Sequence, residues 1–317
     1  RRGTELRCRN WRAEALLRLL ENVLEVGERP EELVVYASIG KAVKDWDAYR
    51  RIVDALHHIE EDQTLVLQTG RPVAVLNTHA AAPMVVSAVN NTVGNWATEE
   101  RFYSRLAEHK TIWGGLTAAA WQYIGRQGVL GGTYELLRAA LEKHFREPSA
   151  PHRWVLTAGL GGMGSSQPIS ARMLELSTLV VEADPAKLAK LEAAGGIDLV
   201  IEDLDDALAT ISTAAAERQS VAVGLLGNAA DVFPAVAASG ARPDIVTDQT
   251  AAHDARYGYL PSGYTLESWA EARATDPERV ERDARVSMAT QVRAMLALKQ
   301  RGSVVFENGN NLRVQAS

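Results

Sequence analysis

A short apolar run leads directly into a cluster of glycines in the middle of this 317-residue chain. The segment reads Arg153-Trp-Val-Leu-Thr-Ala-Gly-Leu-Gly-Gly-Met-Gly164, a strand pattern followed by G-x-G-x-x-G. Eighteen residues after Gly164, the next apolar run ends in Glu182. A strand, three spaced glycines, a helix and an acid in this order are typical of the βαβ unit that binds dinucleotides.

Each part of this pattern has a physical role. Gly159 permits the tight turn, the second glycine lets the backbone approach a pyrophosphate, and the third lets helix and strand pack closely. The N-terminus of the next helix offers N–H groups and a partial positive charge to phosphates. Glu182 is placed to accept hydrogen bonds from a ribose, and its charge would repel a 2′-phosphate, so NAD is favoured over NADP. The alternative is a glycine turn without a ligand, which leaves the clustering of three glycines unexplained.

Composition argues against several other classes of protein. The net charge is −6 and no basic tract occurs, so nucleic acid is not an expected partner. No apolar run reaches the roughly 18 residues of a membrane span, and the N-terminus shows no signal-peptide core. Cys8 is the only cysteine, which excludes an internal disulfide and makes the cytoplasm the expected location. No spacing of histidine with cysteine or carboxylate indicates a metal site.

The first 150 residues predict an N-terminal α/β domain. Helical periodicity indicates helices over 10–25, 46–59, 99–109 and 133–145, and strand-like runs cover 31–36, 64–68 and 73–76. Residues 37–42 are expected to turn into a helix, and 69–72 to form a hairpin-like turn. A glycine-rich segment covers 113–132, and residues 147–151 are the expected linker.

Beyond the linker, strands and helices alternate. Strands are predicted at 153–158, 178–183, 197–201, 220–226, 244–247 and 303–307. Helices are predicted at 166–175, 185–194, 204–217, 229–239, 266–274 and 277–300. This alternation predicts an α/β fold with a doubly wound, mostly parallel, Rossmann-like sheet over 151–307. Residues 308–317 are expected to start a return to the N-terminal domain.

Two more loops fall at predicted strand ends, where ligands bind in such sheets. One spans 224–230 and contains Asn228, a plausible helix cap. The other spans 247–254 and contains Asp248 and His253, which are candidates for proton handling. An isolated histidine is more often a surface or capping residue, but within this polar cluster ligand contact is an equal alternative.

Seven groups of residues carry a resemblance to one family. They are Leu33-Val-Val-Tyr36 with Ile39-Gly-Lys-Ala42, Trp121-Gln-Tyr-Ile-Gly125 with Gln127-Gly-Val129 and Gly132-Thr-Tyr-Glu135, the segment Trp154–Gly164, Gly227-Asn-Ala-Ala230, Val246-Thr-Asp-Gln-Thr250 with Ala252-His-Asp254, Gly258-Tyr-Leu-Pro261, and Gly309-Asn-Asn311. With these motifs the chain resembles the urocanase family, the urocanate hydratases. The resemblance runs from Arg2 to the last residues.

The resemblance implies a hydro-lyase that works as a homodimer and does not catalyse net redox chemistry. In the family, NAD⁺ is tightly bound and is not consumed, and its nicotinamide C4 acts as an electrophile toward the imidazole of the substrate. Water then adds across the conjugated side chain of this imidazole acrylate. An ordinary NAD-dependent dehydrogenase and a non-catalytic NAD-binding module are the rival interpretations, because fold does not fix function.

The resemblance also implies the contacts. For NAD they are Ala37, Ser38, Gly162, Met163, Gly164, Glu182, Lys187, Asn228, Ala229, Gln249, Thr250, Ala251, Ala252, His253, Tyr259 and Leu260. For the substrate they are Tyr36, Gly115 and Thr117. The rings of Tyr36, Trp113 and Trp121 could pack on a flat ligand, and ordinary core packing is an equal alternative for each.

Several positions depart from the family pattern. The family has Tyr-Gly-Gly-Ile-Gly where this chain has Tyr36-Ala-Ser-Ile-Gly40, and arginine where it has Lys187. It has glutamine where this chain has Gly115, and tyrosine where it has Asn308. The last two changes open volume, which predicts a bulkier, ring-modified substrate such as thiourocanate or its S-methyl derivative from ergothioneine breakdown.

No catalytic residue is assigned from the sequence. The family has a further C-terminal part with a glycine-rich segment and a cysteine regarded as an active-site residue, and nothing here matches it. Cys8 lies in the N-terminal segment and is interpreted as a packing residue rather than the counterpart of that cysteine. The chain is therefore expected to be a fragment or to lack the catalytic region.

Overall fold

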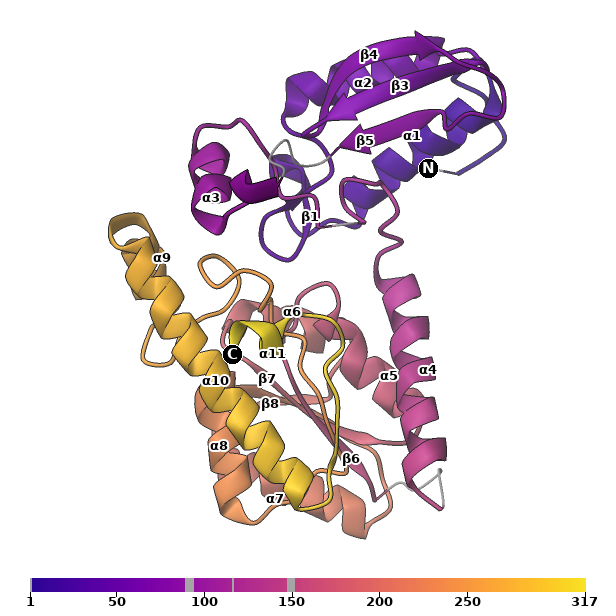
Figure 1. Ribbon diagram of the computed structural model, residues 1–317. Helices are drawn as coiled ribbons and strands as arrows, with labels where there is room; N and C mark the ends of the chain where they lie inside the picture. Colours follow the sequence, from indigo (N-terminus) through magenta and orange to yellow (C-terminus); the bar gives the residue numbers. More distant parts are fainter. Residues whose placement is uncertain (1, 89–93, 116, 147–151) are drawn as a thin grey trace. The chain divides into compact units, whose positions relative to one another are not determined.

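The computed structural model describes residues 2–88, 94–115, 117–146 and 152–317 (Figure 1). The chain divides into two compact units, Arg1–Gly125 and Arg126–Ser317. The expected linker, 147–151, lies outside the described residues. The division falls before helix α4 (Arg126–His144), which packs on α5 (Gln167–Met173), so α4 belongs with the second unit rather than with the first.

The first unit is built on a three-stranded sheet with β3 (Gln63–Gln68) in the centre. β3 pairs antiparallel with β4 (Arg71–Asn77) and parallel with β5 (Val85–Ala88). The predicted hairpin between β3 and β4 is confirmed. Its turn holds Thr69 and Gly70 at positive φ, a geometry that matches the twist of the two strands. The other elements are α1 (Trp11–Glu25), η1 (Pro30–Glu32), β1 (Val34–Tyr36), β2 (Gly40–Lys41), α2 (Trp46–His58), η2 (Gly94–Trp96) and α3 (Glu99–Ala107).

Two local predictions in this unit are wrong. The predicted strand 31–36 starts only at Val34, because Pro30 opens the 3₁₀ turn η1 and Leu33 ends it at φ +62°. Residues 37–42 do not turn into a helix; they return as β2, which pairs antiparallel with β1. Helix α2 starts later, where the Asp45 carboxylate caps it by accepting a hydrogen bond from the Ala48 N–H at 2.8 Å.

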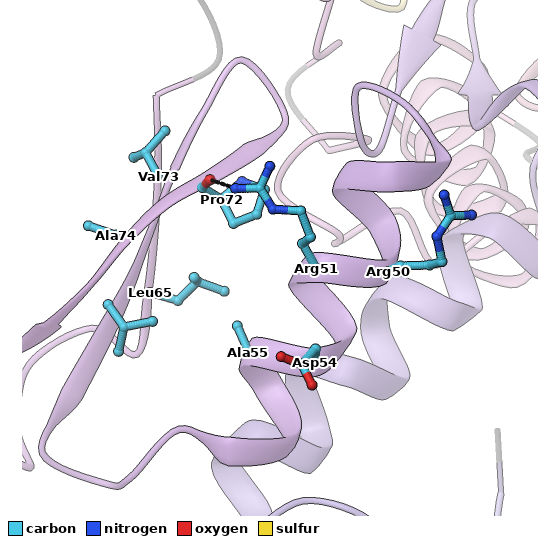
Figure 2. Close-up of a pocket in the computed structure, with 9 residues that line it drawn as sticks. Arg50, Arg51, Asp54, Ala55, Leu65, Pro72, Val73 and Ala74 are labelled. Atoms are coloured by element: carbon cyan, nitrogen blue, oxygen red, sulfur yellow. Dashed lines mark hydrogen bonds between the residues drawn. The ribbon is translucent and has the colours of Figure 1, made fainter.

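A shallow hollow of about 510 Å³ lies between α2 and the β3–β4 hairpin (Figure 2). Leu65 and Ala55 form its floor, and Arg51 donates a hydrogen bond to the Pro72 carbonyl at 3.2 Å along its rim. None of the residues predicted to bind a ligand lines this hollow.

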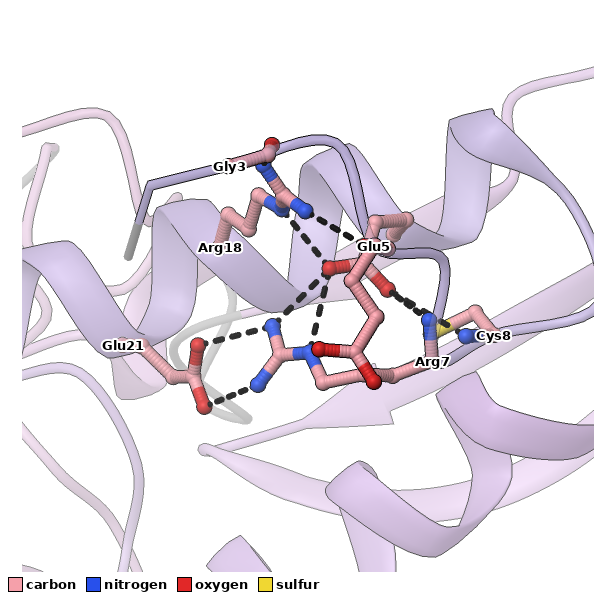
Figure 3. A network of polar contacts seen from close by, with 7 residues as sticks. Gly3, Glu5, Arg7, Cys8, Arg18 and Glu21 are labelled. Atoms are coloured by element: carbon pink, nitrogen blue, oxygen red, sulfur yellow. Dashed lines mark hydrogen bonds and ion pairs between the residues drawn. The ribbon is translucent and has the colours of Figure 1, made fainter.

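The N-terminal segment is fastened to α1 by ion pairs (Figure 3). The buried Glu14 carboxylate accepts hydrogen bonds from Arg7 and from Arg18, and Arg7 also pairs with Glu21 at 2.8 Å. The same carboxylate accepts the Cys8 N–H at 3.2 Å, and the Cys8 side chain is buried.

The second unit is a six-stranded sheet in which every pair is parallel, which confirms the predicted doubly wound α/β fold. Its strands are β6 (Trp154–Ala158), β7 (Ser177–Glu182), β8 (Leu199–Ile201), β9 (Ala222–Leu226), β10 (Ile245–Val246) and β11 (Val304–Val305). Its remaining helices are η3 (Gly164–Ser166), α6 (Pro185–Ala193), α7 (Leu204–Ala216), α8 (Ala229–Ser239), α9 (Leu266–Thr275), α10 (Pro277–Gln300) and α11 (Leu312–Gln315).

Helices cover both faces of this sheet (Figure 1). Alternate strand residues such as Leu156 and Leu179 point to a core shared with α7, α8 and α10. The intervening residues, such as Val155 and Val180, pack toward α4, α5 and α6. Burial on both faces explains why these strands read as nearly continuous apolar runs.

The strand order β11-β10-β6-β7-β9-β8 locates the place where a ligand is expected. From β6 the chain moves outward through β7 to β8 and β9, and then returns to add β10 on the opposite side of β6. The order therefore reverses between β6 and β10. In open parallel sheets, ligands bind outside the carboxyl ends of the strands at such a switch point. Among the described residues, no helix combines the length and apolar character needed to cross a membrane.

Candidate functional site

The glycine turn after β6 is folded so tightly that side chains are excluded. Gly159 has φ +87°, and a Cβ added to it would lie 2.5 Å from the Gln249 carbonyl oxygen and 2.7 Å from the Thr250 nitrogen. A Cβ added to Gly164 would lie 1.9 Å from the Gly159 carbonyl oxygen. The turn is therefore packed against its own backbone and against the Gln249–Thr250 peptide. This peptide follows β10, so the contact brings together the segments that follow β6 and β10.

Glu182, at the end of β7, is bound to this turn. One carboxylate oxygen accepts the Leu160 N–H at 2.7 Å, and the other accepts the Asp184 N–H at 3.0 Å. The Lys187 ammonium lies 3.9 Å from the second oxygen. A carboxylate offers about four acceptor positions, so Glu182 keeps capacity for two further donors such as ribose hydroxyls.

The helix after the turn is shorter than predicted. Instead of a helix over 166–175, the 3₁₀ turn η3 leads into α5, which spans only Gln167–Met173. Glu175 follows at φ +59°, a left-handed conformation that ends the helix before β7.

The loop after β10 surrounds a buried carboxylate. Asp248 has no exposed surface and accepts hydrogen bonds from Thr250, Gln291 and Asn310. Burial raises the pKa of the Asp248 carboxyl to about 6, although the hydrogen bonds from these three residues oppose the rise. Asp248 is therefore inaccessible to a ligand and cannot exchange a proton with one directly.

Two other predicted contact residues act as supports. The Tyr259 hydroxyl is buried and donates to the Gln291 amide oxygen at 2.7 Å. Asn228 caps α8, as predicted, by accepting the Ala230 N–H at 2.8 Å. Its amide also donates to the Leu260 carbonyl at 3.0 Å, which holds the 258–261 loop against the start of α8 next to Ala229.

Gln249 and His253 are the polar side chains of this loop that a ligand could engage. Among the described residues, the buried Gln249 Nε2 finds no acceptor, so a donor is left without a partner beside the glycine turn. His253 is half-buried, and Asn311 lies 3.2 Å from its Nδ1. Burial lowers the pKa of the His253 imidazole, which favours the neutral ring at pH 7.

The structure brings together most of the residues predicted to contact NAD in the second unit. Gly162, Met163 and Gly164 follow β6, Glu182 ends β7 with Lys187 near it, Asn228 and Ala229 follow β9, and 249–253 follow β10. All lie at the carboxyl edge of the sheet. Gln291 and Asn310, which join this site through Asp248, were not predicted.

The three predicted substrate residues gather within the first unit. The Thr117 hydroxyl donates to the Tyr36 hydroxyl at 3.0 Å, and the Thr117 N–H lies 3.4 Å from the same oxygen. A Cβ added to Gly115 would lie 3.1 Å from that oxygen. Because Tyr36 receives hydrogen bonds here, its own O–H proton remains available to a ligand.

Trp121 belongs to the core rather than to a ligand surface. It is 2% exposed, and its indole N–H donates to the Ala42 carbonyl at 3.1 Å. The core alternative is therefore the better interpretation of this ring.

Ala37 and Ser38 stand where the family pattern has two glycines, and both have positive φ, at +54° and +69°. Side chains in this region are strained by their Cβ atoms. We expect Ala37→Gly to raise the free energy of unfolding by up to about 1 kcal/mol, because relief of strain outweighs the added freedom of the unfolded chain. Urea unfolding of the variant, with Ala48→Gly inside α2 as a destabilising control, tests this; a loss of stability in Ala37→Gly would contradict it.

Cys8 has the properties of a packing residue. It is 5% exposed, and burial raises the pKa of its thiol to about 11, so the thiol is not ionised near neutral pH. A neutral thiol is a poor nucleophile. Within the described residues, no group of three or more histidine, cysteine or carboxylate side chains is arranged to hold a metal ion.

Comparison with known proteins agrees with this arrangement. The protein-family model of the urocanase N-terminal domain matches residues 1–122. The protein-family model of the urocanase Rossmann-like domain matches residues 125–317. S-methyl thiourocanate hydratase from Variovorax sp. (strain JCM 16519 / RA8) is 47% identical over 315 residues, which are 99% of this chain and 57% of that protein. The chain thus spans little more than half the length of this relative. On the two domain matches and the identity together, the chain belongs to the urocanase family.

Proposed function

We propose that this chain serves in a urocanase-type hydratase that binds NAD⁺ and adds water to S-methyl thiourocanate. The observation that carries the proposal is the tight glycine turn from Gly159 to Gly164 at the β6–β10 switch point, where Glu182 accepts the Leu160 N–H. Family membership and the name of the 47% identical relative support the reaction class and the substrate.

The residues at the switch point fit NAD⁺. Three glycines in the turn after β6 are the pattern by which a backbone approaches a pyrophosphate, and Glu182 keeps acceptor capacity for ribose hydroxyls. Gln249 offers a buried amide donor that has no partner among the described residues. When bound, the oxidised nicotinamide ring supplies an electrophilic carbon for the imidazole of the substrate.

We propose that the residues of this chain bind and orient the cofactor and the substrate. We assign the backbone of Gly162, Met163 and Gly164 to the pyrophosphate and Glu182 to a ribose. The remaining proposed NAD contacts are Ala37, Ser38, Lys187, Asn228, Ala229, the 249–253 segment and the backbone of Tyr259 and Leu260. Tyr36 would donate its free proton to the substrate, and Gly115 beside it presents no side chain that could exclude a ring substituent. The homodimer, the cytoplasmic location and a place in ergothioneine breakdown remain predictions from the family resemblance.

The substrate is tested by following the acrylate absorbance of S-methyl thiourocanate, thiourocanate and urocanate with the NAD⁺-loaded chain, alongside calorimetric binding of each compound. We expect S-methyl thiourocanate to bind the chain more tightly than urocanate does, and any loss of its chromophore to occur without net formation of NADH. Preference for plain urocanate would contradict the substrate proposal. Release of NADH in proportion to substrate would instead identify a dehydrogenase.

A further inference from the structure

Asp248 is an unusual residue for a protein core. Its carboxylate accepts hydrogen bonds from four donor groups, all on neutral residues, and it pairs with no cation in the described chain. Burying an unpaired carboxylate is unfavourable, and an apolar residue of similar size usually serves stability at least as well. Its place at the end of β10, beside the switch point, suggests a role in the site instead.

A chain of hydrogen bonds leads from Tyr259, through Gln291 on helix α10, to this carboxylate. The Tyr259 hydroxyl donates to Gln291 Oε1 at 2.7 Å, and Gln291 Nε2 donates to Asp248 Oδ1 at 2.8 Å. Because the tyrosine proton occupies the amide oxygen, the NH₂ end of Gln291 is directed toward Asp248. All three side chains are buried, so water does not compete for these bonds.

The other carboxylate oxygen holds the loop backbone. Asp248 Oδ2 accepts the Thr250 hydroxyl at 2.6 Å and the Thr250 N–H at 3.2 Å. Asn310 donates to the same oxygen and also to the Thr250 carbonyl, at 3.0 Å, so it binds both the carboxylate and the loop backbone. This fixes the Gln249–Thr250 peptide, on which Gly159 rests at the distances given above.

We propose that Asp248, Gln291 and Asn310 are positioning residues that fix the Gln249–Thr250 peptide against Gly159 and so preorganise the glycine turn for the pyrophosphate. The inference rests on the proposed NAD site, but it assigns the three side chains no direct contact with the dinucleotide. Preorganised groups bind more tightly because less ordering remains to be done when the ligand arrives.

The network should make NAD affinity depend on pH. Only the ionised carboxylate can accept from all four donors, because protonation adds an O–H among them. With the pKa of Asp248 at about 6, the network is intact above that pH and is lost below it. Other titratable groups lie around Asp248 or its partners. Burial raises the pKa of Tyr259 well above its usual value, and the charge of Asp231 adds to that rise. Burial lowers the pKa of His253, and the charge of Glu307 opposes that change.

The test is calorimetric titration of NAD⁺ into the full chain stripped of cofactor, from pH 5 to pH 8. Asp248→Asn removes the charge at constant size, and Gln291→Leu removes one donor to the carboxylate. Gln300→Leu is the matched control, because the same substitution is made at an exposed site on the same helix. Circular dichroism checks that each variant is folded. If Asp248→Asn does not fold, the result for Gln291→Leu alone tests the inference.

We expect wild-type affinity to fall as the pH drops through 6. Asp248→Asn should bind roughly tenfold more weakly at pH 8, the scale of one lost hydrogen bond to a charged group, and show no such fall. Gln291→Leu should move the midpoint to higher pH, because the carboxylate loses a stabilising donor. Gln300→Leu should match the wild type.

Two results would overturn the inference while leaving the NAD site standing. In one, Asp248→Asn and Gln291→Leu bind NAD⁺ with the affinity and pH profile of the wild type. In the other, the pH dependence persists in Asp248→Asn and disappears in His253→Asn, which would assign it to the imidazole. Failure of the wild type to bind NAD⁺ at any pH would instead reject the proposed function, and the inference with it.

Discussion

Replacing Gly164 by alanine is expected to weaken NAD⁺ binding by at least about 100-fold, the equivalent of roughly 3 kcal/mol. The added Cβ would lie 1.9 Å from the Gly159 carbonyl oxygen and 2.6 Å from the carbonyl carbon, where non-bonded carbon contacts are about 3.5 Å. Both atoms belong to backbone, so no side-chain rotation can relieve the overlap. The turn would have to open, and its backbone N–H groups would move away from the position proposed for the pyrophosphate.

Calorimetry of NAD⁺ binding measures this effect, and thermal unfolding of the same variant separates it from a loss of fold. Gly131→Ala is the matched control, because its added Cβ meets nothing within 4 Å and Gly131 lies inside α4. We expect the control to bind NAD⁺ normally and to gain up to about 1 kcal/mol in stability from the helix propensity of alanine. Wild-type affinity in a folded Gly164→Ala variant would show that the dinucleotide does not bind at this turn.

Replacing Glu182 by glutamine is expected to weaken NAD⁺ binding by between about 10-fold and 100-fold. The carboxylate accepts the Leu160 and Asp184 N–H groups, one on each oxygen. A glutamine can satisfy only one of them, because its NH₂ group must face the other donor. The variant also loses acceptors for ribose hydroxyls and the charge that opposes a 2′-phosphate, so the preference for NAD over NADP should shrink.

The comparison requires NAD⁺ and NADP⁺ affinities for the wild type, Glu182→Gln and Glu192→Gln. Glu192 lies on the exposed surface of α6, so its substitution removes a carboxylate without touching the glycine turn. Equal losses of NAD⁺ affinity in both glutamine variants would show that the effect comes from the change in net charge and not from the position of Glu182. An unchanged NAD-to-NADP ratio in Glu182→Gln would contradict the assignment of Glu182 to the ribose.

The parallel sheet was predictable because its signals are local. Strands β7, β8 and β9 are short apolar runs, each followed by a helix whose N-terminus is capped by a side chain, at Asp184, Asp203 and Asn228. The glycine turn was predictable for the same reason, since three glycines and an acid at fixed spacing have few other uses. In the sheet, β9 lies between β7 and β8, although it follows both in the sequence. This order depends on packing between distant segments, and no sequence pattern predicted it.

The supports of the site were harder to predict than its surface. Gln291 lies on the buried stripe of α10 with Ala284 and Met288, and a polar residue at an apolar position of the helical repeat was the available signal. Asn310 gave no signal beyond its place in the Gly-Asn-Asn motif. The positive φ values of Ala37 and Ser38 were not expected either, because alanine and serine normally avoid that region.

The proposed binding of NAD at the carboxyl ends of β6 and β10 is tested most directly by purifying the chain, denaturing it and assaying the released small molecules for NAD⁺, with a second sample reconstituted with NAD⁺ and then washed. We expect stoichiometric NAD⁺ from the wild type and little or none from Gly164→Ala. Absence of NAD⁺ from the wild type, even after reconstitution, would contradict the assignment of the segment from Gly159 to Glu182.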